Sequence, residues 1–248
     1  MTNSIQNGVS IIIPSYNEVK VIKKTLINIF KYVKVPKEVI VVDDSNDDTG
    51  KIVKKFARTH RKIVFIKNRL SNKGFVNALQ VGVKRARKNT IVFVMADKCD
   101  DPRTINKMYQ KIIDGWDVVC GSRYMTKGKR IGGPELLGFL SKCLCVLSYF
   151  TIQIPTHDVT NTFKMYRKQV LRKLRFNFDA GTAVSMELLL QAHFNNSKIT
   201  EIATVWKGRP ETRFKLSQRG PKYIRILKWS IKNRFRKDIG YKLKNFYY

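Results

Sequence analysis

Residues Val9-Ser-Ile-Ile-Ile-Pro-Ser-Tyr-Asn-Glu18 begin with a short β-branched apolar run, which stops at a proline and leads into a polar segment. Such a run is typical of a strand that is buried on both faces of a parallel sheet. Further short apolar runs follow along the first half of the chain, at 39–42, 63–66, 91–95 and 118–120. Each of them predicts another strand.

Helical patterns occupy the segments between these runs. Apolar residues recur at helical spacing over 19–33, 48–58 and 74–88, and Pro102 begins a further helix, since proline is tolerated at the first helical position. The alternation of strands and helices predicts an α/β fold with a mostly parallel sheet flanked by helices. The 248 residues contain no GxGxxG and no GxxxxGKS/T, which argues against a dinucleotide fold and a P-loop.

The strand ends carry the residues that bear on function, because ligands of such sheets bind outside the carboxyl ends of the strands. In this chain those ends correspond to residues 14–18, 43–48, 96–101 and 121–124. The first three segments carry acidic residues, in a chain that has only 18 Asp and Glu. Carboxylates grouped at one sheet edge can hold a divalent cation and bind ribose hydroxyl groups.

The chain is strongly basic, with 49 Lys and Arg and a formal net charge of +31. Such a surface attracts phosphate-bearing partners, namely nucleic acid, anionic lipid or phosphorylated substrates. A nucleic-acid-binding protein is the alternative that charge alone suggests, and a compositional bias toward lysine is another. Binding of nucleic acid leaves the acidic strand ends unexplained, so we expect no nucleic acid among the partners.

Two segments of the second half bear on location. Residues 136–154 are strongly apolar but contain Lys142 and several other polar residues, which favours a buried or interfacial helix over a membrane span. Residues 217–248 are basic and rich in aromatic residues, which predicts an amphipathic tail on a membrane surface. Four cysteines without a CxxC pair, and an N-terminus without a signal-peptide pattern, predict a cytoplasmic location.

Four blocks, in order along the chain, carry a family resemblance. They are the opening run through Glu18, Val41-Val-Asp-Asp-Ser-Asn-Asp-Asp-Thr49, Asp117-Val-Val-Cys-Gly-Ser-Arg-Tyr124 and His157-Asp-Val-Thr-Asn-Thr-Phe-Lys-Met-Tyr-Arg167. Over about residues 8–230 the chain resembles the family 2 glycosyltransferases of the GT-A fold, a Rossmann-like α/β fold. The last two blocks resemble the dolichol-phosphate mannose synthase branch of that family.

The resemblance implies a nucleotide-sugar donor, GDP-mannose or a UDP-sugar. Pro14, Tyr16 and Glu18 would line its base and ribose pocket, and Asp43 would contact the base or the ribose. For Asp43 the alternative role is turn formation before the next helix.

A loop after Arg209 resembles the family segment that closes over the donor pyrophosphate. Spacing from Arg209 favours Lys215 for the second basic position of that segment. The register of the Pro221-Lys-Tyr223 stretch favours Arg213 with a shortened loop instead. Both assignments stay open.

The metal site that the resemblance implies is atypical. Family members usually carry Asp-x-Asp after the fourth strand, but an ungapped match puts Ala96-Asp97-Lys98 there. Asp97 would then be the main donor-side carboxylate, with Asp100 or Asp101 supplying a second oxygen to Mg²⁺ or Mn²⁺. Alternatively, Asp101 caps the following helix, and Lys98 supplies part of the charge of the metal.

The acceptor side contains Arg123, which matches a family arginine associated with the acceptor phosphate, together with Ser141 and Lys142 on the following helix. A phosphomonoester is largely a dianion at neutral pH, so such an acceptor needs cationic positioning rather than a base. A sugar hydroxyl would need a general base. Asp158 and Glu187 are the candidates for that role.

We therefore expect an inverting glycosyltransferase that moves a sugar, mannose by resemblance to the branch, onto dolichyl or polyprenyl phosphate, with Asp97, Arg123 and Arg209 as catalytic residues. Its catalytic domain would span 1–216, with a donor half over about 1–125 and an acceptor half over about 126–216. The protein would lie peripherally on the cytoplasmic face of a membrane, attached directly or through a membrane-anchoring partner. Transfer to a sugar hydroxyl in surface polysaccharide synthesis is the alternative within the family.

Overall fold

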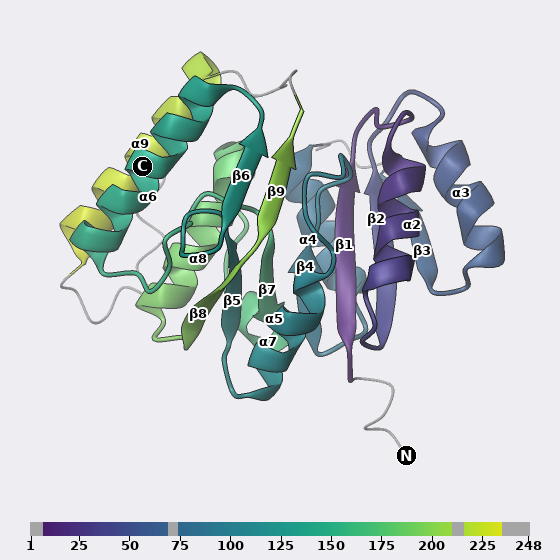
Figure 1. Ribbon diagram of the computed structural model, residues 1–248, viewed down its shortest axis with the longest axis horizontal. Coiled ribbons are helices and arrows are strands. Elements are labelled where there is room, and N and C mark those ends of the chain that lie inside the picture. Colours follow the sequence, from purple (N-terminus) through teal and green to yellow (C-terminus); the bar gives the residue numbers. More distant parts are fainter. Residues whose placement is uncertain (1–6, 69–73, 210–215, 235–248) are drawn as a thin grey trace.

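The computed structural model describes residues 7–68, 74–209 and 216–234. In the first half of the chain, strands and helices alternate as the apolar pattern predicts (Figure 1). The strands are β1 (Val9–Ser15), β2 (Lys37–Asp43), β3 (Ile63–Lys67), β4 (Thr90–Phe93) and β5 (Val118–Ser122). The helices are α2 (Ile22–Tyr32), α3 (Thr49–Thr59), α4 (Phe75–Arg85) and α5 (Thr104–Ile113).

A seven-stranded sheet in the order β3-β2-β1-β4-β7-β5-β8 forms the centre of the molecule. Strand β1 pairs in parallel with β2 and β4, β2 with β3, and β5 with β8 (Ile199–Ala203). Strand β7 (Lys164–Arg167) runs antiparallel between β4 and β5. The mostly parallel α/β fold is thus confirmed. The two strands from the second half were not predicted, because they are short and carry polar residues without a clear alternation.

Two apolar cores cover opposite faces of the sheet, and β1 contributes to both. Ile12 lies in one core, whereas Ile11 and Ile13 lie in the other. Since successive side chains of a strand point to opposite faces, this double burial explains the uninterrupted apolar run. Helix α4 packs closely on β1, because a Cβ added at Gly82 would lie only 2.4 Å from Cγ2 of Ile12.

The second half adds a small ribbon and a group of helices. Strands β6 (Lys129–Gly132) and β9 (Val205–Gly208) pair in parallel. The helices are α6 (Glu135–Ile152), α7 (Lys168–Leu171), the 3-10 helix η1 (Phe178–Ala183), α8 (Val184–Phe194) and α9 (Leu216–Asn233). Helices α6 and α9 lie side by side on one flank, at the left of Figure 1.

Helix α6 corresponds to the apolar segment predicted as a buried or interfacial helix, and few of its residues are buried. Only 22% of its residues are buried, and it is the one helix within the described ranges that is long and apolar enough to cross a membrane. Core helices of soluble proteins also meet that criterion.

Helix α9 covers much of the predicted tail. It buries Ile226 and Leu227 and contacts α6, α8 and η1, so this part of the chain is integrated into the folded body. Residues 235–248 of the tail lie outside the described residues. The division of the chain at residue 216 stays a prediction.

Candidate functional site

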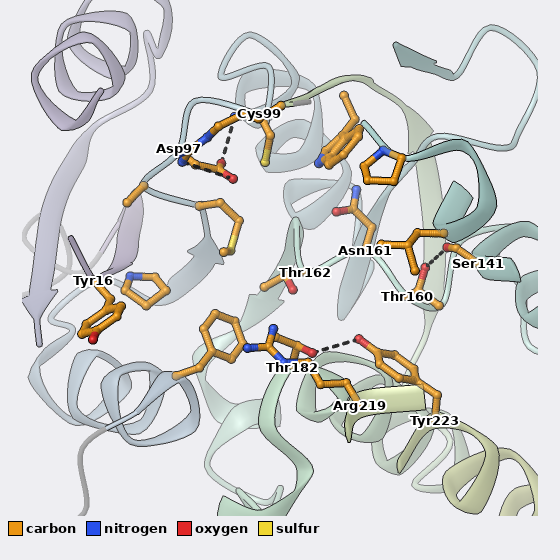
Figure 2. Close-up of a pocket in the computed structure, with 18 of the residues that line it drawn as sticks. Tyr16, Asp97, Cys99, Ser141, Thr160, Asn161, Thr162, Thr182, Arg219 and Tyr223 are labelled. Carbon is orange, nitrogen blue, oxygen red and sulfur yellow. Dashed lines mark hydrogen bonds and ion pairs between the residues drawn. The ribbon is translucent and has the colours of Figure 1, made fainter. Parts of the chain in front are cut away.

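The carboxyl ends of β1, β2 and β4 line a cavity of about 1090 Å³ that also reaches α6 and α9 (Figure 2). Loops after the three strands contribute polar groups to its lining. The two helices contribute mainly apolar side chains, namely Leu137, Leu140 and Leu144 of α6 and Leu216, Tyr223 and Ile224 of α9. The cavity therefore joins a polar compartment at the sheet edge to an apolar one.

The predicted donor residues at and after the end of β1 all line the cavity: Pro14, Tyr16 and Glu18. Their loop is braced by the loop after β2. The backbone N–H of Asn17 donates to Oγ of Ser45 over 2.7 Å, and that of Glu18 donates to Oγ1 of Thr49 over 2.9 Å. Asn17 adopts a φ of 53°, a conformation that asparagine tolerates. Tyr16 is half-exposed at the rim of the cavity.

Asp43 and Asp44 take different positions although they are adjacent. Asp43 is fully buried, accepts a hydrogen bond from Nζ of Lys67 over 3.0 Å, and is absent from the cavity lining. Asp44 lines the cavity, and its Oδ2 accepts the N–H of Gly74 over 2.9 Å. Its Oδ1 is buried without a partner in the part of the chain that the structure describes. Of these two neighbours, Asp44 is therefore the one whose carboxylate faces the donor side.

The loop after β4 separates the three carboxylates predicted to bind a metal. Only Asp97 lines the cavity, and its Oδ1 accepts the N–H of Cys99 over 3.1 Å. Asp100 is buried and accepts the N–H of Met95, and its burial raises its pKa to about 6 although that hydrogen bond favours the ionised form. Asp101 accepts hydrogen bonds from the backbone N–H and the guanidinium of Arg103, just before α5.

Arg209 directly follows β9 and reaches the donor side from a distant part of the sequence. Its Nη2 lies 2.6 Å from Oε2 of Glu18 and 3.6 Å from Oδ2 of Asp97. Its Nε is buried and has no hydrogen-bond partner among the described residues. The preceding Gly208 packs on Trp206, since an added Cβ would lie 2.4 Å from that ring. Arg213 and Lys215, the two alternatives for the next basic position, lie outside the described residues.

These residues do not fit a divalent-cation site. The structure brings no three His, Cys, Asp or Glu side chains together as ligands within residues 7–68, 74–209 and 216–234. The carboxylates of Asp100 and Asp101 accept hydrogen bonds from Met95 and Arg103. The side chains of Ala96 and Lys98 have no oxygen. The carboxylates of Glu18 and Asp97 both contact Arg209, so a cation already lies between them. Of the three carboxylates, only that of Asp97 lines the cavity, and the expected role of Asp97 with Asp100 or Asp101 as metal ligands stays a prediction.

Arg123, at the end of β5, lines the cavity with a guanidinium that Asp158 holds in place. The Asp158 carboxylate accepts the backbone N–H of Arg123 over 2.9 Å, its Nε over 2.7 Å and its Nη2 over 2.8 Å. Burial opposes charge on both groups, but their mutual attraction outweighs it, which lowers the pKa of Asp158 and raises that of Arg123. The guanidinium also lies 4.9 Å from the ring of Tyr124 and 5.7 Å from that of Trp206.

Hydroxyl groups surround the guanidinium of Arg123. Its Nη2 donates to Oγ1 of Thr160 over 2.7 Å and contacts Oγ of Ser141 at 3.4 Å. These two hydroxyl groups are 2.7 Å apart (Figure 2). Lys142, which was predicted to contact the acceptor phosphate with Ser141, is exposed on α6 and is not among the residues that line the cavity.

Three further lining residues were not singled out from the sequence as site residues: Thr160, Arg219 and Tyr223. The hydroxyl of Tyr223 donates to Oγ1 of Thr182 over 3.5 Å, and Arg219 lies beside Tyr223 on α9 (Figure 2). Thr160 lies inside the fourth block of family resemblance, His157–Arg167, so its position in that block could have identified it as a site residue. Arg219 and Tyr223 fall in the basic segment 217–248, for which the sequence predicted only a membrane-surface tail.

A GT-A glycosyltransferase is the class that this fold and site define. The structure superposes on glucosyl-3-phosphoglycerate synthase from Mycobacterium tuberculosis in complex with UDP, with a TM-score of 0.66, 17% identity, and coverage of 91% of this chain and 80% of that one. It also superposes on residues 1–349 of S. aureus TarS, with a TM-score of 0.64, 20% identity, and coverage of 96% and 73%. The chain belongs to glycosyl transferase family 2, whose sequence pattern matches residues 10–175.

Curated relatives confirm the predicted resemblance to the dolichol-phosphate mannose synthase branch. The polyprenol monophosphomannose synthase of Mycolicibacterium smegmatis is 25% identical over 93% of this chain and 89% of its own length. The dolichol-phosphate mannosyltransferase of Pyrococcus furiosus is 28% identical over 84% of this chain, but the match covers only 59% of that protein. Among the solved neighbours, the Mycobacterium tuberculosis synthase has also been solved with Mn²⁺ and UDP.

Proposed function

We propose that this glycosyltransferase moves a sugar from a nucleotide-sugar donor to the phosphate of a polyprenyl phosphate, with inversion, at the cytoplasmic face of a membrane. One observation carries the proposal: a single cavity is lined by nucleotide-side loops at one end and by apolar helices at the other, with Arg123 in its lining. The names of the curated relatives, which include polyprenol and dolichol phosphate, support the same acceptor class. Mannose and GDP are proposed from these relatives alone.

The acceptor phosphate would bind at the cluster of Arg123, Ser141 and Thr160. A guanidinium whose plane is fixed by Asp158 can grip two phosphate oxygens at once, and the two hydroxyl groups add hydrogen bonds. The leucines of α6 would contact the first isoprene units. Because the phosphate is already largely a dianion at neutral pH, positioning it against the donor sugar is the main task on this side.

The reaction forms a bond from an acceptor phosphate oxygen to the anomeric carbon and breaks the bond from that carbon to the donor pyrophosphate. The nucleoside diphosphate leaves with one additional negative charge, and no proton has to be removed from the acceptor. Fixed cations near the leaving oxygen lower the barrier, since they bind the charge that develops in the transition state. Arg209, at the donor side of the cavity, is placed for this role.

Transfer to a sugar hydroxyl is less well supported, because its two candidate bases are poorly placed. Asp158 is fully buried, and the charge of Arg123 lowers its pKa, so it is a weak proton acceptor. Glu187 is buried on α8, and neither residue is among those that line the cavity. A base near the acceptor is what that alternative requires.

Peripheral attachment to the membrane would use the flank formed by α6 and α9. Large apolar side chains are exposed along α6, including Leu136, Phe139 and Phe150. Helix α9 adds a surface depression lined by Trp229 and by three basic residues: Arg225, Lys228 and Lys232. Apolar residues beside cations and an indole are the composition of a membrane-interface surface.

The function is tested by offering the purified protein GDP-mannose, UDP-glucose and UDP-N-acetylglucosamine, each with polyprenyl phosphate in detergent. We expect organic-extractable, lipid-linked sugar from one of these donors. Its absence with all three donors, in protein that still binds a nucleoside diphosphate, would reject the acceptor assignment.

A pair of neighbouring variants tests the acceptor site. Ser141→Ala, which removes a hydroxyl from the cluster around Arg123, is expected to raise the KM for polyprenyl phosphate without changing the KM for the donor. Lys142→Ala removes an exposed charge from the next position, outside the lining, and is expected to leave both values unchanged. Equal effects of the two variants would contradict the placement of the acceptor phosphate.

A further inference from the structure

The donor side of the cavity holds an arginine between two carboxylates, in the region where the family usually binds a metal. We propose that the guanidinium of Arg209 replaces the divalent cation, so that this enzyme binds the donor pyrophosphate without a metal ion. This inference rests on the proposed function, because it specifies how the same site binds its nucleotide.

The geometry around Arg209 is the first argument. One nitrogen, Nη2, lies 2.6 Å from Oε2 of Glu18 and 3.6 Å from Oδ2 of Asp97. A metal ion bound by Asp97 would lie next to this guanidinium and be repelled by it. Within the described residues, the guanidinium hydrogen-bonds to these carboxylates through Nη2 alone, and a guanidinium carries donors suited to two phosphate oxygens at once.

Hydrogen bonds to neighbouring segments hold Glu18 and Asp97 in position beside Arg209. The backbone N–H of Glu18 is fixed by Thr49, and Oδ1 of Asp97 accepts the N–H of Cys99. The N–H of Lys207, on the strand that leads to Arg209, donates to the carbonyl oxygen of Cys99 over 2.9 Å. The loop with Asp97 and the end of β9 are therefore tied together, which fixes the guanidinium relative to both carboxylates.

The composition of the loop after β4 is an independent argument. At the two positions where the family usually has aspartates, this chain has Ala96, which is buried, and Lys98, which is exposed. Asp100 and Asp101, the nearest substitutes, accept hydrogen bonds from Met95 and Arg103 instead. Of the side chains at positions 96–98, only Asp97 offers an oxygen to a metal, and Lys98 adds a positive charge.

The cavity carries positive charge besides that of Arg209. Its lining contains more arginine than carboxylate side chains: Arg123, Arg130, Arg209 and Arg219 against Glu18, Asp44 and Asp97. When the bond to the sugar breaks, the leaving nucleoside diphosphate gains one negative charge. A guanidinium that is already oriented can bind that charge without reorganisation.

The experiment is titration calorimetry of the EDTA-treated full chain with UDP and with GDP, repeated with added Mn²⁺. We expect at least one of the two to bind in EDTA, with a dissociation constant within about threefold of that in Mn²⁺. If Mn²⁺ tightens the binding of both by about tenfold or more, the inference is wrong while the proposed function stands. If neither nucleotide binds under either condition, the donor site itself is rejected, and the proposed function with it.

Variants of Arg209 supply the second readout. Arg209→Ala is expected to weaken the binding of the nucleoside diphosphate in EDTA by about tenfold or more, with the affinity for the corresponding nucleoside unchanged. Arg209→Lys keeps the positive charge but not the planar set of donors, so its affinity for the nucleoside diphosphate should lie between those of the parent protein and Arg209→Ala. Lys207→Ala removes a cation two residues away on the same strand, outside the lining, and is the matched control. Two results would overturn the inference. One is an equal loss of nucleotide affinity in Lys207→Ala and Arg209→Ala, and the other is unchanged nucleotide affinity in an Arg209→Ala protein whose melting temperature is that of the parent.

Discussion

Asp158→Asn should destabilise the protein strongly, because it removes the negative charge from a buried ion pair. The side chain of Asp158 is fully buried, and that of Arg123 is 10% exposed. Three N–H groups of Arg123 and the N–H of Asn161 converge on the carboxylate at 2.7 to 3.1 Å. An amide of the same shape would direct its NH₂ group at one of these donors and leave the guanidinium without a counter-charge.

The expected loss is about 3 to 5 kcal/mol of the free energy of unfolding, the range found when one partner of a buried pair is removed. Urea denaturation followed by tryptophan fluorescence measures it, since Trp206 lies 5.7 Å from the guanidinium. The double variant Arg123→Met/Asp158→Leu should lose less than the two single variants added together, because it leaves no unpaired charge. A loss below about 1 kcal/mol in Asp158→Asn, typical of exposed pairs, would refute the reasoning.

The pH dependence of stability supplies a second check on the same pair. The charge of Arg123 lowers the pKa of Asp158 in the folded protein despite its burial. The resulting stabilisation is therefore present above the unfolded pKa of about 3.9 and is lost as the pH falls through the folded value. The difference between the parent protein and Asp158→Asn should be constant from about pH 5 to pH 8 and should shrink in more acidic solution. A difference that grows on acidification would contradict this assignment of charges.

Three further predictions concern other parts of the molecule. Burial raises the pKa of Asp100 to about 6, so the folded state loses stability as the pH rises toward and through that value. Asp100→Asn removes this loss and should stabilise the protein by up to about 3 kcal/mol at pH 8. The gain should vanish near pH 4, where the carboxyl group is protonated in the folded protein. Gly82→Ala should destabilise it by about 1 to 3 kcal/mol in urea titrations, because the new Cβ would lie 2.4 Å from Cγ2 of Ile12. Phe139→Ser/Phe150→Ser should weaken binding to anionic vesicles by about tenfold or more in sedimentation assays, since both rings are exposed on α6.

The vesicle assay has a matched control, and each of the other two predictions has an outcome that would contradict it. For the vesicle assay the control is Ile113→Ser, which removes a side chain that is 60% exposed on α5, away from the α6–α9 flank. Equal weakening by this variant would contradict the membrane orientation. A gain in Asp100→Asn that does not vary with pH would show that its cause is not proton binding. Unchanged stability in Gly82→Ala would show that α4 can shift away from β1.

The sequence alone predicted the central part of the fold. The apolar runs in the first half are local signals. Strands β1, β4 and β5 are buried along their whole length, and β2 over its last five residues, so their runs of β-branched residues can be recognised without knowledge of their neighbours. The same local pattern located the strand ends, where Pro14, Tyr16, Glu18 and Asp97 line the cavity. The amphipathic pattern of α9 identified a helix, but its alternation did not indicate which neighbours its inner face would contact.

Tertiary structure decided which charged groups meet, because side-chain contacts depend on packing between segments that are far apart in the sequence. Arg209 and Glu18 are separated by 191 positions, so no spacing rule predicts that the guanidinium lies between Glu18 and Asp97. Asp100 and Asp101 are adjacent to each other, yet one is buried against Met95 and the other bonds Arg103 at the surface. A carboxylate in a sequence is a candidate metal ligand, and only the packing around it determines whether its oxygens face the ligand.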